Sequence, residues 1–274
     1  MAQSPQVRLN NGVEIPQLGF GVWQVSTDDI VAAVTTALEV GYRHIDTAAI
    51  YGNEEGVGRA IADSGIARDE LFVTTKLWNA EQGFDSTLAA FDASLARLGL
   101  DHVDLYLIHW PAPDRNAYVD TWKAFERIYA DGRARSIGVS NFLPEHLHHL
   151  LEQTDVVPAV NQIELHPTHS RPDLRALHAE LGIQTEAYSP LGLAQDLTAP
   201  AVVEIAGRLG RTPAQVILRW HLQAGRIVFP KSVNPGRIAE NFDVFGFELS
   251  AEDMAAIDAL DTGNRLNQDP ATFN

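Results

Sequence analysis

The chain has 274 residues, of which 45% are hydrophobic and 20% are charged, so it can bury a full core and is not disordered as a whole. Its 20 lysines and arginines against 36 aspartates and glutamates give a net charge of −16, which argues against nucleic-acid binding because no basic face is available to neutralise phosphates. The lack of cysteine excludes disulfides, thiolate nucleophiles and cysteine-ligated metal centres. No secretory signal and no apolar run of about 20 residues is present, so we expect a cytoplasmic protein with no membrane contact.

The first predicted element is a hairpin over residues 7–15, in which Asn11-Gly12 is the preferred pair for a type I′ turn. After it, short apolar runs alternate with segments of helical periodicity to the end of the chain. The predicted strands cover residues 17–21, 42–45, 71–75, 103–108, 136–139, 159–163, 184–187 and 227–229. The predicted helices cover residues 28–40, 54–63, 86–98, 118–130, 144–151, 173–181, 235–242 and 250–260, and a longer helical stretch covers residues 201–223. Within that stretch, TPAQ at residues 212–215 predicts a helix N-terminus, with an N-cap threonine, a proline at the first position and a capping-box glutamine.

Eight strands alternating with helices predict an α/β fold with parallel strands. This number of units in about 250 residues is that of a (β/α)8 TIM barrel. We therefore expect residues 1–274 to form one barrel domain with an N-terminal β-hairpin and two additional C-terminal helices. The alternative is an open doubly wound sheet, but the nearest match to its dinucleotide-binding fingerprint, GFGVWQ at residues 19–24, lacks the third glycine.

Polar residues follow the ends of the predicted strands, and in a barrel these ends meet at one rim that carries the active site. Tyr51 lies on the loop that follows the second strand. We therefore expect one site at this rim. In chain order, the residues at the strand ends are Asp46, Thr47, Lys76, His109, Trp110, Ser140, Asn141, Gln162, Tyr188, Ser189, Lys231 and Ser232.

Four of these residues suit the reduction of a carbonyl group. A buried Lys76 needs a carboxylate partner to keep its proton, and Asp46 is placed to supply it. The lysine charge lowers the pKa of a neighbouring phenol from about 10 towards neutrality, which makes Tyr51 a usable general acid. A neutral His109 can donate a hydrogen bond that orients the carbonyl oxygen. Taken singly, these residues read as a structural salt bridge, a core histidine and a surface tyrosine. Together they favour a catalytic tetrad.

Motifs that cover nearly the whole chain resemble the aldo-keto reductase family, and among its members the bacterial 2,5-diketo-D-gluconate reductases. The motifs are LGFGVW at residues 18–23, GYRHIDTA at 41–48, YGNE at 51–54, TKLW at 75–78, DLYLIHWP at 104–111, IGVSNF at 137–142, NQIELHP at 161–167 and PKS at 230–232. The resemblance implies a monomeric NADPH-dependent reductase of aldehydes and ketones, including keto sugars, dicarbonyls or keto esters. It assigns Tyr51 as the general acid, Lys76 and Asp46 as the residues that tune it, and His109 as the residue that orients the substrate.

The resemblance also implies the cofactor site. Tyr188 would stack on the nicotinamide, residues 189–193 would wrap the pyrophosphate, and Arg237 would help to hold the 2′-phosphate. Asn234 stands where some relatives have arginine, so NADH is a possible but weaker cofactor than NADPH (or NADP+ in the reverse reaction). The residues assigned to the cofactor are Gly21, Val22, Trp23, Asp46, Ser140, Asn141, Gln162, Tyr188, Ser189, Pro190, Leu191, Leu193, Lys231, Ser232, Val233, Arg237, Glu240 and Asn241.

The substrate is expected to be a small-molecule carbonyl compound. By the resemblance, Trp23, Trp78 and Trp110 wall the substrate pocket beside Tyr51 and His109. The segment after the last predicted helix is short and contains Phe273, which indicates an open site with broad substrate tolerance.

Two other functions are compatible with parts of this pattern. Some relatives are channel subunits or lens proteins, so an NADPH-binding redox sensor or structural protein is the alternative on the same fold. A sugar isomerase or a phosphate-binding lyase would need clustered metal carboxylates or a glycine-rich phosphate loop, and the sequence shows neither. His146 and His149 are spaced for one helix face, which we expect to be solvated, and no metal site is predicted.

Overall fold

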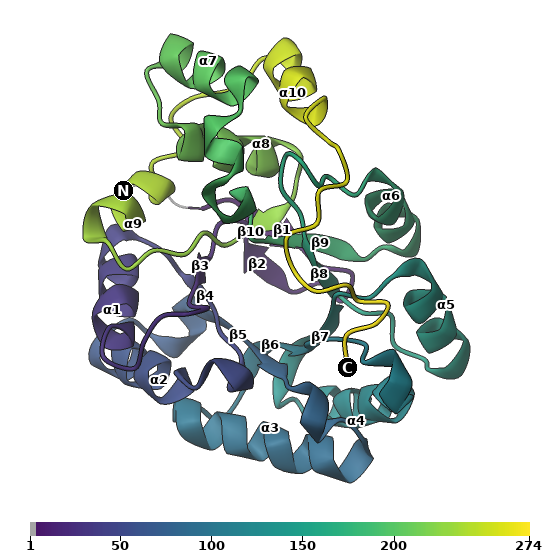
Figure 1. Ribbon diagram of the computed structural model, residues 1–274. Helices are drawn as coiled ribbons and strands as arrows, with labels where there is room; N and C mark the ends of the chain where they lie inside the picture. Colours follow the sequence, from purple (N-terminus) through teal and green to yellow (C-terminus); the bar gives the residue numbers. More distant parts are fainter. Residues whose placement is uncertain (1–3) are drawn as a thin grey trace.

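The computed structural model describes residues 4–274, in which eight parallel strands surround a central axis (Figure 1). Neighbours in the sheet follow chain order, and the barrel closes where Leu18 bridges Val228 and the Gly19 N–H donates to the Val228 carbonyl at 2.8 Å. The predicted (β/α)8 barrel is therefore confirmed. The strands are β3 (Phe20–Gly21), β4 (His44–Asp46), β5 (Phe72–Leu77), β6 (Val103–Ile108), β7 (Ala134–Ser140), β8 (Val160–Glu164), β9 (Gln184–Tyr188) and β10 (Ile227–Val228).

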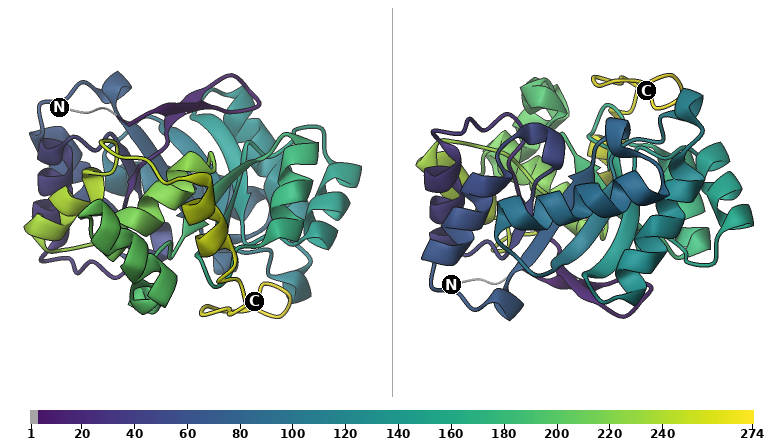
Figure 2. Two further views of the ribbon diagram at one scale, coloured as in Figure 1. Left: turned by 90° about the horizontal axis from the view of Figure 1, so that it is seen from above. Right: turned by 90° about the horizontal axis from the view of Figure 1, so that it is seen from below.

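Helices form a ring outside the strands (Figures 1 and 2). They are α1 (Ile30–Val40), α2 (Glu54–Asp63), α3 (Phe84–Leu98), α4 (Tyr118–Ala130), α5 (Pro144–Gln153), α6 (Pro172–Leu181), α7 (Pro200–Leu209), α8 (Pro213–Gln223), α9 (Pro235–Phe242) and α10 (Ala251–Asp258). Short 3₁₀ turns cover Ala49–Tyr51, Arg68–Glu70, Asn79–Glu81, Pro113–Arg115, Gly192–Ala194 and Asp196–Thr198. Within the described residues, no helix is both long and apolar enough to cross a bilayer.

The helical stretch expected over residues 201–223 consists of two helices, and the second begins at the helix N-terminus that was predicted at Thr212. Gly210 ends α7 with a φ of 61°, a conformation that glycine adopts without steric cost. Thr212 then starts α8 through a capping box, in which the Gln215 N–H donates to the threonine hydroxyl at 3.3 Å and the Thr212 N–H donates to Gln215 Oε1 at 3.0 Å.

The N-terminal hairpin, β1 (Gln6–Arg8) and β2 (Glu14–Pro16), covers the end of the barrel away from the C-terminal segment (Figure 2). Leu9 and Ile15 are buried in one cluster with barrel residues such as Phe72, so the hairpin closes this end. The predicted type I′ turn is wrong. Of Asn11 and Gly12, only Gly12 has a positive φ, of 88°, and its N–H donates to the Leu9 carbonyl at 2.9 Å. A type I′ turn needs positive φ at both central residues.

Candidate active site

A cleft of about 1170 Å³ opens at the carboxyl ends of the strands, where the sequence placed the site. The predicted residues that line it are Gly21, Trp23, Asp46, Tyr51, Trp78, His109, Trp110, Ser140, Asn141, Gln162, Tyr188, Ser189, Pro190, Leu191, Leu193, Lys231, Ser232, Arg237, Glu240 and Asn241. Lys76 lies beneath this surface and is fully buried. Two predicted cofactor residues do not line the cleft: the Val22 side chain packs in the core, and Val233 is 47% exposed.

An ion pair lies at the floor of the cleft. Lys76 on β5 donates to Asp46 Oδ1 on the adjacent β4 at 2.6 Å and to the Thr47 carbonyl at 2.9 Å. Burial lowers the pKa of Lys76, but the charges of Asp46 and Tyr51 outweigh it, and the pKa is raised above its ordinary value. The lysine is therefore a permanent buried cation at physiological pH.

Tyr51 lies directly above this cation. It ends a 3₁₀ turn after β4, and its ring centroid is 5.3 Å from Lys76 Nζ. Burial raises the pKa of the Tyr51 phenol above its ordinary value of 10.0, and the charge of Lys76 acts in the opposite direction. The prediction that Lys76 lowers the pKa of Tyr51 towards neutrality is therefore wrong, because burial outweighs the lysine charge and the net shift is upward. Tyr51 keeps its proton throughout the neutral pH range.

His109 faces Tyr51 across the cleft. The two rings meet edge to face with centroids 5.8 Å apart, and Trp78 contacts the imidazole from another side at 5.5 Å. Burial and the nearby Lys76 charge hold the pKa of His109 well below its ordinary value of 6.5, so the ring is neutral at physiological pH. Together, Asp46, Tyr51, Lys76 and His109 (the tetrad) present one protonated phenol and one neutral imidazole on the cleft surface.

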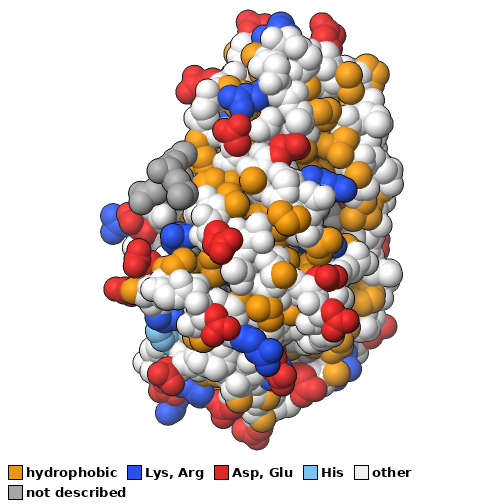
Figure 3. Space-filling model, turned by 90° about the vertical axis from the view of Figure 1, so that its left-hand side faces the viewer, with side chains coloured by type: hydrophobic (Ala, Val, Ile, Leu, Met, Phe, Trp, Pro, Cys, Tyr) orange, Lys and Arg blue, Asp and Glu red, His pale blue; other side chains and the backbone are white. Residues whose placement is uncertain are grey.

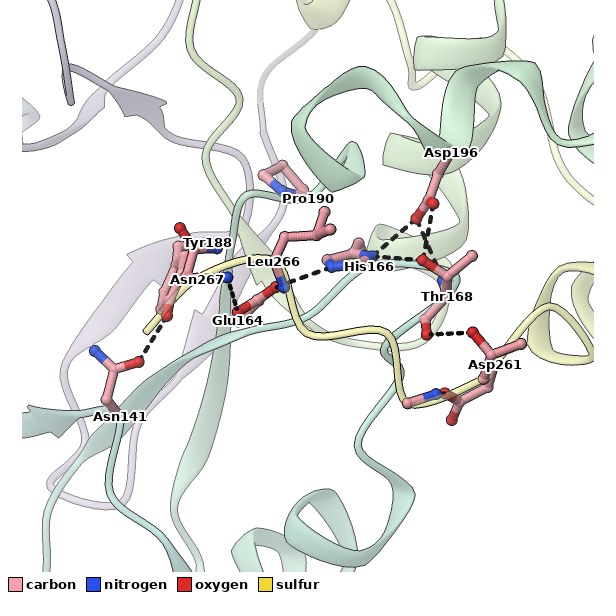
Figure 4. Close-up of polar contacts among 12 residues, drawn as sticks. Asn141, Glu164, His166, Thr168, Tyr188, Pro190, Asp196, Asp261, Leu266 and Asn267 are labelled. Atoms are coloured by element: carbon pink, nitrogen blue, oxygen red, sulfur yellow. Dashed lines mark hydrogen bonds and ion pairs between the residues drawn. The ribbon is translucent and has the colours of Figure 1, made fainter. Parts of the chain in front are cut away.

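Polar side chains from β7 to β9 continue the cleft away from the tetrad. Tyr188 donates its hydroxyl proton to Asn141 Oδ1 at 2.8 Å (Figure 4). Asn141 Nδ2 in turn donates to the His109 carbonyl at 3.0 Å. Ser140 donates to the Gln162 carbonyl at 2.8 Å. The first two bonds hold the aromatic ring of Tyr188 and the amide side chain of Asn141 in place.

Glu186 is a buried acid that the sequence reasoning missed. Gln162 Nε2 donates to Glu186 Oε2 at 2.9 Å and to Asp46 Oδ2 at 2.9 Å, so one amide bridges two carboxyl groups. Burial and the charge of Asp46 raise the pKa of Glu186 to about 8. The available signal was a charged residue within the predicted strand at residues 184–187. Since both N–H groups of Gln162 are used, its Oε1 atom is left as the acceptor.

Basic residues gather at the opposite end of the cleft, near the start of α9. Lys231 and Arg237 are exposed, and among residues 4–274 neither forms an ion pair. Asn234 caps α9 by accepting the Arg237 N–H at 3.1 Å. On the face that carries α1 and α9, acidic and basic side chains of the described residues are interspersed, without a continuous basic area (Figure 3). The site therefore offers local cations on an acidic protein.

Aromatic residues and the C-terminal segment form the outer walls. Trp23 is 41% exposed at the rim, and Phe273 packs on Trp110 with ring centroids 4.7 Å apart and on Trp78 at 6.2 Å. Leu266, Asn267 and Gln268 also line the cleft. The sequence analysis considered only Phe273 of this segment and missed the wall that residues 266–268 form.

The expected solvated face at His146 and His149 is wrong for His146. Its ring is buried against Tyr118 and Phe142, and Nδ1 accepts the Leu143 N–H at 3.1 Å. Among residues 4–274, no three histidine, aspartate or glutamate side chains are arranged so that they could hold a metal ion.

The fold and the site define a class of protein: a (β/α)8 barrel whose cleft holds a protonated tyrosine above a buried lysine cation. The chain belongs to the aldo-keto reductase family, since the family model "Aldo/keto reductase family" matches residues 17–262. An aldo-keto reductase of Mycolicibacterium smegmatis is 60% identical over 271 residues, which cover 99% of this chain and 98% of that protein.

Two further comparisons cover the whole barrel. The morphine 6-dehydrogenase of Pseudomonas putida is 52% identical, with 98% of this chain and 95% of that protein covered. The crystal structure of a Gox0644 mutant in complex with NADPH matches with a TM-score of 0.96 and 49% identity, and it covers 100% of both chains.

Proposed function

We propose that this protein reduces small aldehydes and ketones to alcohols with NADPH, and that Tyr51 is the proton donor. As an aldo-keto reductase it is an NADP(H)-dependent oxidoreductase, and the related structures include complexes with NADPH and NADP. The observation that carries the finer proposal is the placement of Tyr51, protonated at neutral pH, over the buried Lys76 cation and opposite His109.

The three side chains divide the work on the substrate. NADPH, when bound, supplies the hydride that reaches the carbonyl carbon. Tyr51 gives its proton to the carbonyl oxygen, and the Lys76 charge stabilises the phenolate that is left. Neutral His109 donates a hydrogen bond to the same oxygen and so fixes the face of the carbonyl that is attacked. Asp46 keeps Lys76 charged.

The residues of the cleft fit this cofactor. Gln162 uses both amide hydrogens on Asp46 and Glu186, so its Oε1 can accept only from a donor such as the NH₂ group of the nicotinamide carboxamide. The Tyr188 ring, fixed by its bond to Asn141, offers a flat face for the nicotinamide. Lys231, Ser232 and Arg237, near the N-terminus of α9, supply cations and a hydroxyl for the 2′-phosphate.

The test of the proposal is a panel of aldehydes, ketones, dicarbonyls and keto esters assayed separately with NADPH and NADH. We expect oxidation of NADPH with one or more carbonyl classes, and slower turnover with NADH. An NADPH-binding protein that reduces no member of the panel would instead support the sensor or structural alternative.

The 2′-phosphate contacts give a prediction for cofactor choice. Replacing one charged partner of a phosphate costs roughly 1.5–3 kcal/mol, which is about tenfold to a hundredfold in affinity. We therefore expect Arg237→Ala to raise the Kd for NADPH by this factor and to leave the Kd for NADH nearly unchanged, as measured by quenching of protein fluorescence. Arg127→Ala, which removes an exposed arginine of α4, is the matched control. Equal weakening of both cofactors would place Arg237 away from the phosphate.

A further inference from the structure

A second buried ionisable cluster lies outside the tetrad. It consists of Glu164 at the end of β8, His166 and Asp196, which we call the clasp. His166 Nδ1 is 2.9 Å from Asp196 Oδ2, and Nε2 is 3.2 Å from Glu164 Oε1. All three residues are at most 3% exposed, and Figure 4 shows the imidazole between the two carboxylates.

The chemistry of these contacts makes His166 a cation. Ionised carboxylates only accept hydrogen bonds, and a neutral imidazole has a single N–H, so only the doubly protonated ring can satisfy both partners. Burial lowers the pKa of His166, but the hydrogen bonds and charges of Asp196 and Glu164 outweigh it and raise the pKa above 6.5. Burial alone would raise the pKa of Glu164 and of Asp196, but hydrogen bonds from His166 and from backbone N–H groups lower both.

On one side, the clasp holds the C-terminal segment, residues 261–274. Glu164 accepts the Leu266 N–H at 2.6 Å and the Asn267 N–H at 3.1 Å, and both of these residues line the cleft. The carbonyl of Thr168 accepts the Asn264 N–H at 2.9 Å, which adds an anchor nearby. The position of the wall at residues 266–268 is therefore set by Glu164.

On the other side, the clasp holds residues 189–199, which we call the cofactor loop. Ser189, Leu193 and Ala194 have positive φ values of 47°, 49° and 72°. Residues other than glycine are strained in this conformation and keep it only where other contacts impose it. Asp196 supplies such contacts, because it accepts from His166 and from the hydroxyl of Thr168 at 2.9 Å. Leu191, Leu193 and Ala194 line the cleft.

We propose that His166 is a positioning residue that couples the two walls of the cleft, so that cofactor affinity and carbonyl selectivity depend on each other through the clasp. The inference rests on the proposed placement of NADPH against the cofactor loop. Glu164 holds the wall at residues 266–268 (the substrate wall), and Asp196 belongs to the cofactor loop (the cofactor wall). His166 joins the two carboxylates directly, and Thr168 adds a second link, because it donates to Asp196 and its carbonyl accepts the Asn264 N–H. A shift of either wall therefore changes the hydrogen bonds available to the other.

The clasp also predicts a pH window. Burial lowers the pKa values of the neighbouring His169 and His221, so both histidines are neutral at physiological pH. The other ionisable side chains that interact with the clasp or with these two histidines are Tyr188, Arg171, Arg175, Arg226, Asp261 and Arg265. Because the pKa of His166 is raised on folding, the contribution of its charge is complete below the ordinary imidazole value of about 6.5 and is lost as the pH rises through the raised value. At the acid end, the contribution is lost as Glu164 and Asp196 become protonated.

Cross-effects between the walls test the coupling. We expect Glu164→Gln, on the substrate wall, to raise the Kd for NADPH. We expect Asp196→Asn, on the cofactor wall, to increase deuterium uptake at the backbone amides of residues 264–268 and to raise the KM for the carbonyl substrate. Couplings of this kind amount to roughly fivefold or more. Thr168→Val removes one hydrogen bond to Asp196 without leaving a buried charge unpaired, so it tests the same effect in a milder form. Asp120→Asn, at an exposed ion pair, is the control.

The outcomes are distinct. Cross-effects in both directions, with a pH dependence of NADPH affinity that differs between the wild type and His166→Gln, support the clasp. Because NADPH ionises in the same way in both measurements, its own titration does not contribute to the difference between the pH profiles of the wild type and His166→Gln. The proposed coupling is overturned if each substitution affects only the wall that carries it, or if the wild type and His166→Gln have identical pH profiles. If the proposed function is wrong, the wild-type protein itself will reduce no carbonyl compound, and this result is distinct from the outcomes above.

Discussion

Replacing Tyr51 by phenylalanine should abolish most of the reductase activity and leave cofactor binding intact. The substitution removes only the hydroxyl, and the ring can keep its edge contact with His109 and its place above Lys76. General acid catalysis by a positioned side chain contributes roughly 10²–10⁴-fold, so we expect kcat to fall by this factor. Single-turnover reduction of an activated aldehyde measures the loss, and fluorescence titration measures the Kd for NADPH.

The matched control is Tyr129→Phe, which deletes a phenol on α4 outside the cleft. Its kcat should equal that of the wild type. If Tyr51→Phe instead kept activity within about tenfold of the wild type, another group would supply the proton. His109 is then the nearest alternative donor, although its lowered pKa leaves it neutral at physiological pH.

The sequence predicts the tetrad well because strand ends in a barrel converge on one rim. Asp46 and Lys76 are 30 residues apart, yet they lie on adjacent parallel strands, so alternation and strand length alone bring them together. The boundaries of β6 and α4 also follow from periodicity, because both segments have clear apolar patterns. The boundary between α7 and α8 does not follow from periodicity, because the apolar pattern of residues 201–223 continues across Gly210, where α7 ends.

The clasp and the net pKa of Tyr51 could not be predicted from local patterns. Glu164 meets the Leu266 N–H across 102 residues, and the contact depends on how the C-terminal segment crosses the finished barrel. The upward pKa shift of Tyr51 depends on the burial of its hydroxyl by the cleft walls, which no spacing of residues reveals. Chemistry at a strand end is therefore more predictable than the environment that surrounds it.

Lys76→Met tests whether the buried cation assists the proton donor. The variant removes the cation that pairs with the buried Asp46 carboxylate, and breaking a buried ion pair in this way costs about 3–5 kcal/mol of stability. Reduction should be slow because no cation stabilises the phenolate. The double variant with Asp46→Asn removes the unpaired charge, so it should recover much of the lost thermal stability and none of the rate.

The pH profile separates the two possible acids. In the wild type, burial already holds the pKa of Tyr51 above 10.0, so reduction should stay constant through neutral pH and decline only as the pH rises through that raised value. Alcohol oxidation, which needs the phenolate, should rise over the same alkaline range. Lys76→Met removes the charge that opposes the upward shift, and the oxidation limb should move to still higher pH. If His109 were the donor, the reduction rate would instead fall as the pH rises through the lowered pKa of His109, and His109→Gln would abolish this limb. Lys76→Met would shift the same limb to higher pH, because the Lys76 charge helps to lower the pKa of His109. Rate profiles of the wild type and both variants, measured in each direction, therefore assign the proton to one of the two residues.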